Sequence, residues 1–286
     1  MNIVRLTLCL SLFLSINVMA FQVNAFNLKV GDTYKVKVNE SQVITQTAGS
    51  LSNKIITEIE SLELLKVEDI TQEGDYVIAL TILELKTVVA SPVMSIVEDT
   101  ENENIGTGLY PALKNSTYRF QMSNKGEIIR IIDLEDLKGQ LKSELRSNRQ
   151  ARGQIELLLS EEAVISNLKQ RLSYFPETEK MKWSVNKDMD MYSMLVSVDS
   201  EYSYKNDYTI NSSGTMSVNS SIDLFGTTTQ VELTGSINAT YTLNRLSGVP
   251  YTILSSNNIS GNALAMGISI PMTFKTETKT TFSKQY

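Results

Sequence analysis

The sequence contains no histidine, and this absence limits the chemistry that the protein can perform. Without an imidazole group, neither the Ser-His-Asp and Cys-His catalytic arrangements nor histidine-based zinc sites can form. The general base that enzymes use most often is missing for the same reason. The composition therefore excludes many hydrolases and metalloenzymes, and it leaves enzymes that work with carboxylates.

Cysteine is almost as scarce as histidine. Cys9 is the only cysteine among 286 residues, and it lies in an apolar run near the N-terminus. Once that run is removed as a secretory signal, the chain has no disulfide and no thiolate metal ligand. We therefore expect the fold to be stabilised by packing alone, which a chain of about 260 residues can provide.

The N-terminus has the three-part layout of a secretory signal peptide. Arg5 precedes an apolar run from Leu6 to Phe13, and small residues follow at Ala20 and Ala25. Cleavage fits after either alanine, and we favour Ala25. This predicts a signal peptide at 1–25, a single β-rich domain at 26–286, and an exported protein in the periplasm or at the cell surface.

Excess positive charge is also lacking. Lys and Arg number 26 against 32 Asp and Glu, which gives a formal net charge of −6. The basic residues are scattered among the acidic ones and form no stripe that would attract phosphate. We therefore expect neither a nucleic-acid partner nor binding to an anionic membrane surface.

Strict alternation of apolar and polar residues dominates the last third of the chain. In TTQVELTGSINATYTLN, residues 228–244, one side carries Val231, Leu233, Ile237, Tyr241 and Leu243, and the other is polar. Alternation of this kind predicts a strand with one apolar face. Strands much longer than the usual five or six residues must bend. We predict a mainly β (α+β) fold with a large curved antiparallel sheet, half-barrel or clam-like.

The apolar period changes in the middle of the sequence. Leu134, Leu137, Leu141 and Leu145 recur at spacings of three and four, as in an amphipathic helix. A second helical stretch follows at 154–172, broken near Ser160. We predict that a helical segment at about 134–174 packs in the concavity of the sheet.

One segment fits two structures. Residues 54–69 are rich in Glu, Leu and Lys, which favour a helix, whereas Thr57, Ile59 and the run from Val77 to Leu85 favour strands. We interpret this segment as a strand.

Few residues form a candidate catalytic or metal site. Asp188 and Asp190 would share one side of a strand and could hold a cation or a substrate, although a solvated strand face is the better interpretation. The acidic loop that contains Asp99 has Asn104 in place of the turn glycine of a calcium loop. We therefore predict no catalytic residue, no metal and no cofactor.

Several segments resemble a family of exported bacterial β proteins, a domain-of-unknown-function family. They are LKVGDTYKVKV, NKGEIIRIIDLEDL, YFPETEKMKW, and GVPYTILSSNNISG with the Thr-rich strand that follows. Similar proteins have a Gly-Asp pair before the tryptophan, whereas Met181 and Lys182 precede Trp183 here. The resemblance implies no activity. The architecture we infer is similar to the half-open β clams of periplasmic lipoprotein and lipid carriers.

The apolar strand face and a cluster of methionines in the second half suggest ligand binding, because methionine adapts to irregular apolar shapes. We predict a non-enzymatic exported protein that binds an apolar small molecule, a lipid tail or a peptide on the concave face. The residues predicted to line that face are Leu233, Ile237, Tyr241, Met266, Ile268, Ile270, Met272 and Phe274. Two alternatives stay open: an outer-membrane β-barrel, and a carboxylate-based enzyme that acts on polysaccharide.

Overall fold

The computed structural model describes residues 22–48, 51–92, 94–101, 108–191, 194–224, 227–265 and 267–286. Its strands are β1 (Thr33–Ala48), β2 (Leu51–Ile70), β3 (Tyr76–Ser91), β4 (Met94–Asp99), β5 (Thr117–Met122), β6 (Ile128–Ile132), β7 (Lys182–Met191), β8 (Met194–Asn206), β9 (Thr209–Leu224), β10 (Thr227–Leu243), β11 (Pro250–Ala265) and β12 (Ile268–Gln285). Its helices are α2 (Leu109–Leu113), α3 (Leu134–Glu144), α4 (Arg149–Leu158) and α5 (Glu161–Leu172). Most of the predicted signal peptide lies outside these residues.

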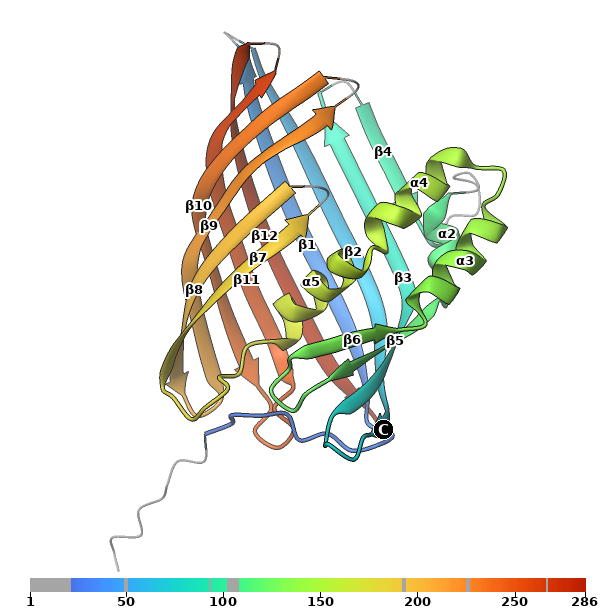
Figure 1. Cartoon of the computed structure of the whole chain (residues 1–286), viewed down its shortest axis with the longest axis vertical. Coiled ribbons are helices and arrows are strands. Elements are labelled where there is room, and N and C mark those ends of the chain that lie inside the picture. Colours follow the sequence, from blue (N-terminus) through green and yellow to red (C-terminus); the bar gives the residue numbers. More distant parts are fainter. Residues whose placement is uncertain are drawn as a thin grey trace, which may run out of the picture.

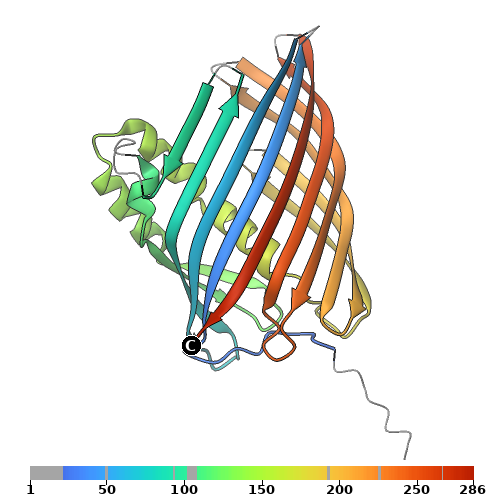
Figure 2. The same cartoon turned by 180° about the vertical axis from the view of Figure 1, so that it is seen from behind.

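The strands form one antiparallel sheet that does not close into a barrel. The strand order is β6-β5-β3-β2-β1-β12-β11-β10-β9-β8-β7, and β4 pairs with β3 beside this path. Figures 1 and 2 show the sheet as a tall, curved half-barrel with the helices along its open side. The prediction of a large curved antiparallel sheet is confirmed.

The segment that fitted two structures is a strand. β2 covers 20 residues and pairs along its length with β1 and β3. Burial against neighbouring strands here outweighs the helix propensity of its Glu, Leu and Lys residues. The strand interpretation of residues 54–69 is therefore confirmed.

Glycines mark places where long strands come unusually close together. A Cβ atom added to Gly235 would lie 2.0 Å from the carbonyl oxygen of Asn258 in β11. A Cβ atom on Gly261 would lie 1.9 Å from the carbonyl oxygen of Glu232 in β10. No side chain fits at these positions, so glycine permits the close backbone approach by which such sheets bend.

The helices lie on one side of the sheet, which we call the inner face; the other side is the outer face. α5 contacts both β6 and β7, the two ends of the strand order, and so bridges the opening of the sheet (Figure 1). The predicted break near Ser160 is confirmed, because the Ser160 side chain caps α5 by accepting a hydrogen bond from the Ala163 amide. Within the described part of the chain, no helix is long and apolar enough to cross a membrane.

The N-terminal segment runs across the lower end of the sheet in Figure 1. Val23 is buried, and its amide donates to the carbonyl oxygen of Asp207 at 3.0 Å. The Tyr204 hydroxyl donates to the Val23 carbonyl oxygen at 2.8 Å, and Lys125 Nζ donates to the Asn24 carbonyl oxygen at 2.8 Å. Residues before Phe26 therefore belong to the folded structure.

Candidate functional site: the inner face of the sheet

The lower half of the inner face is filled by the helices. Its core combines strand residues such as Val36 and Phe120 with helix residues such as Leu141, Ile155 and Leu168, all at most 2% exposed. The helical leucine pattern explains this packing, because residues three and four apart share one helix face. We call this region the helix-filled half.

An aromatic cluster lies in the helix-filled half. The rings of Tyr174 and Tyr241 are 4.8 Å apart, and Trp183 stacks on Tyr202 at 5.5 Å. The Tyr174 hydroxyl donates to the Gly248 carbonyl oxygen at 2.9 Å. Burial raises the pKa of Tyr174 and of Tyr241 well above the ordinary value, so both phenols stay neutral. The cluster therefore acts as apolar core, with its hydroxyl groups as fixed polar contacts.

A largely buried ion pair ties α5 to the sheet. Arg171 Nη1 lies 2.6 Å from Glu63 Oε2 on β2. Both side chains are mostly buried, so their charges satisfy each other away from bulk water. Burial, with a smaller contribution from Glu63, raises the pKa of the neighbouring Tyr118. The pair fixes the helix across the lower half of the inner face.

The upper half of the inner face has a separate apolar cluster made of strand residues alone. We call it the upper patch: Val196, Val198, Met216, Val218, Val231, Leu233 and Ala263 are buried, and Ile237, Ile259, Met272 and Phe274 pack against them partly buried. These residues come from β8–β12. Their shared face follows from the strand registers, in which Val198 pairs with Met216, and Leu233 pairs with Val218 and Gly261.

A band of polar side chains lies beside the upper patch on the same face. In two neighbouring rows the registers align Glu40 with Thr278 and Ser255, and Gln42 with Thr276 and Asn257. Thr278 Oγ1 donates to Glu40 Oε2 at 3.1 Å. Burial raises the pKa of the Glu40 carboxyl, and the Thr278 hydroxyl partly opposes this effect. We call these six residues the polar band.

The predicted ligand-binding residues fall into three groups. Leu233, Ile237, Met272 and Phe274 meet in the upper patch, with the half-buried Ile270 on the same face of β12. Tyr241 lies in the helix-filled half instead, because α5 and Tyr174 cover the lower part of β10. Ile268 shares the inner face but is 62% exposed at the end of β12, and Met266 lies outside the described residues.

Among the described residues, the other candidates from the sequence form no metal or catalytic site, and the side chain of Asp190 lies outside those residues. Asp188 is exposed and accepts a hydrogen bond from Ser197 at 2.6 Å on the neighbouring strand. Across the residues described, no three or more His, Cys, Asp or Glu side chains are grouped to hold a metal ion. Most of the acidic loop lies outside those residues.

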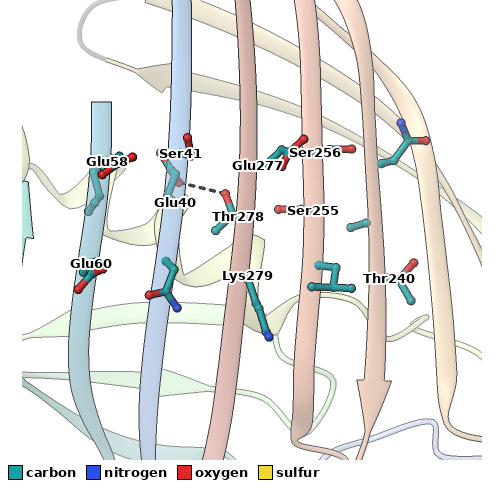
Figure 3. Close-up of a pocket in the computed structure, with 15 residues that line it drawn as sticks. Glu40, Ser41, Glu58, Glu60, Thr240, Ser255, Ser256, Glu277, Thr278 and Lys279 are labelled. Atoms are coloured by element: carbon teal, nitrogen blue, oxygen red, sulfur yellow. Dashed lines mark hydrogen bonds between the residues drawn. The ribbon is translucent and has the colours of Figure 1, made fainter. Parts of the chain in front are cut away.

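A shallow groove of ≈ 660 Å³ crosses β2, β1, β12, β11 and β10 (Figure 3). Most of its lining residues alternate away from the helices, among them Glu58, Glu60, Glu277, Lys279 and Asn238. These side chains are exposed. We therefore place the groove on the outer face; Glu40, Ser255 and Thr278 of the polar band also line it, whereas no residue of the upper patch does.

Sequence reasoning missed part of the inner face. Val196, Val198, Met216 and Val218 extend the upper patch over β8 and β9. Their alternation was visible in the sequence, but nothing local showed that these strands continue the same face as β10 and β12. Glu40 gave no signal, because a single glutamate in a polar strand is ordinary.

Comparison with protein families gave one match. The model described as a family of unknown function, DUF6263, matches residues 73–250, which is more than half of the chain. No curated protein sequence matches.

Comparison with solved structures identified a similar fold in lipovitellin, in a structure concerned with its lipid–protein interactions. The TM-score is 0.52 at 10% identity, and the match covers 91% of this chain and 26% of that chain. The chain thus spans about a quarter of that protein. Pseudomonas aeruginosa OccK5 (TM-score 0.25, 5% identity, 89% of this chain and 99% of that one) and the translocator domain of Neisseria meningitidis autotransporter NalP (TM-score 0.24, 7% identity, 97% of each chain) are too distant to support an argument.

Proposed function

The chain belongs to the DUF6263 family, and starting from that membership we propose that it is an exported, non-enzymatic carrier that binds an apolar ligand, such as a lipid tail, on the upper patch. One observation carries the proposal. Among the described residues, eleven aliphatic, methionine and phenylalanine side chains from five neighbouring strands gather on the inner face, and no helix residue belongs to their cluster. Seven of these side chains are buried, and the four partly buried ones, Ile237, Ile259, Met272 and Phe274, present the apolar surface that a ligand would contact.

The contrast with the helix-filled half supports this proposal. There, the apolar side chains of the same strands pack against α3–α5 and have their partners within the chain. Within the part of the chain that the structure describes, the upper patch has strand partners only. The lipovitellin structure shows that a protein with a similar fold has lipid–protein interactions, which is a precedent for the kind of ligand.

The test uses two neighbouring residues that face opposite sides of one strand. Met272 packs against the upper patch, and Thr273 is exposed on the outer face. Purified without detergent, the wild-type protein should increase the fluorescence of the neutral probe N-phenyl-1-naphthylamine. Met272→Glu should weaken probe binding by about tenfold or more, because a charge would enter the apolar surface. Thr273→Glu should bind as the wild type does.

Native mass spectrometry of the same preparation should reveal co-purified apolar molecules. Circular dichroism must show that both variants retain the strand signal of the wild type. Failure of the wild type to bind the probe, or equal binding by Met272→Glu and Thr273→Glu, would contradict the proposal.

A further inference from the structure

The polar band and the upper patch adjoin each other on the inner face. The row Gln42, Thr276 and Asn257 lies directly below the row Ile44, Phe274 and Ile259, two residues along each strand. Two residues of strand correspond to about 7 Å. A molecule that rests on Phe274 and Ile259 can therefore place a polar end group among the band residues.

The polar band has hydrogen-bond accepting capacity that the described residues do not fill. The Oδ1 atom of Asn257 is buried and has no hydrogen-bond partner among the described residues. Buried polar atoms are nearly always paired, so such an atom calls for a partner. Glu40 accepts one bond from Thr278, whereas a carboxylate can accept about four.

No basic residue balances Glu40 on the neighbouring strands. Its register partners are Ile59 on β2 and Thr278 on β12. Among the described residues, no salt bridge includes Glu40. A second negative charge placed beside Glu40 would be repelled, whereas a positive or neutral donor would be attracted.

Resting on the proposed function, we propose that the ligand is a long-chain amphiphile whose head group donates hydrogen bonds and carries no negative charge. The tail lies along the upper patch, and the head group donates to Glu40 and Asn257. From Thr276 to Ile270 the inner face of β12 extends over six residues, or about 20 Å, which suits a long alkyl chain. The site thus favours long-chain amines and alcohols over fatty acids.

The experiment is displacement of bound N-phenyl-1-naphthylamine by three twelve-carbon competitors below their micelle concentrations. Dodecylamine should displace the probe at about a tenfold lower concentration than dodecanoate, with dodecanol between them. Glu40→Gln keeps the shape of the side chain and should reduce the difference between amine and carboxylate to less than about threefold. Glu232→Gln, on the exposed outer face of β10 and away from the groove, is the matched control and should preserve the wild-type order.

A second variant tests the other acceptor. Asn257→Ala should raise the concentration of dodecanol needed for displacement by about fivefold, because a hydrogen bond to the head group is lost. Probe affinity is measured for each variant first, so that displacement is compared at equal occupancy of the probe.

The outcomes separate the two proposals. Equal or stronger displacement by dodecanoate, with normal probe binding, would overturn the head-group assignment and leave the carrier proposal intact. An unchanged competitor order in Glu40→Gln would also overturn it. Absence of probe binding in the wild type would remove both.

Discussion

The helix-filled half and the upper patch occupy one face of the same sheet, but different elements pack on them: helices on the first, and neighbouring strands on the second. β10 passes through both: Tyr241 lies against Tyr174 under α5, whereas Leu233 lies among strand residues only. The strand pattern is the same in both halves. The difference shows that alternation identifies which face of a strand is apolar. Which residues pack on that face depends on how far the helices extend along the sheet.

The first prediction compares a buried leucine from each half. Leu168→Ala, in α5, should reduce the free energy of unfolding by about 3 kcal/mol, because a cavity opens between helix and sheet. Leu233→Ala should cost about 1 kcal/mol, because no helix residue packs on that cluster and its neighbours can relax. Urea unfolding curves measure both. Equal losses would mean that the upper patch is ordinary core.

The second prediction concerns glycine in each half. Gly235→Ala should destabilise the protein by about 2 kcal/mol, because the new Cβ atom would lie 2.0 Å from the backbone of β11 and the strands would have to separate. Gly139, in α3, has open space around it. Gly139→Ala should therefore stabilise the protein by about 1 kcal/mol through better helix propensity. Thermal unfolding measures both effects. A midpoint temperature that shifts in the same direction for both variants would contradict the role of Gly235 in the close approach of β10 and β11.

The third prediction concerns the segment before Phe26, which packs at the lower end of the sheet. Val23 is buried and Asn24 accepts a bond from Lys125, so for the exported protein that we propose we predict cleavage after Ala20 and not after Ala25. If the proposed export takes place, the intact mass of the processed protein should correspond to a chain that begins at Phe21. A variant produced from Phe26 onward should lose about 1.5 kcal/mol of stability, because it lacks the buried Val23 side chain and its backbone bonds. A natural N-terminus at Phe26 would contradict the prediction.

Much of the fold could be predicted from local patterns. The two-residue period predicted the long strands, and the leucine spacing of 134–145 predicted α3, because each period fixes which side chains share a face. The ambiguity of residues 54–69 could not be resolved by propensity alone. It was resolved by pairing with β1 and β3, which are contacts between distant parts of the chain.

The candidate site was less accessible to sequence reasoning. The apolar stripe predicted for β12 includes Met272 and Phe274, which lie in the upper patch, and Ile268, which is exposed at the end of the strand. Alternation shows the face on which a side chain lies and gives no information about its height on the sheet. The polar band was missed because its members come from β1, β11 and β12, whose alignment depends on strand order and register.

The sequence by itself determined the chemistry and the local geometry: no imidazole, no thiol outside the N-terminal apolar run, and long strands with one apolar side. These properties depend on residue identity and on neighbours along the chain. Only the tertiary structure decided that the helices cover one part of the inner face, and that Glu40 and Asn257 lie beside the upper patch. The packing of the helices on the sheet and the register of the strands depend on contacts between residues far apart in sequence. A local pattern of apolar residues gives no information about such contacts.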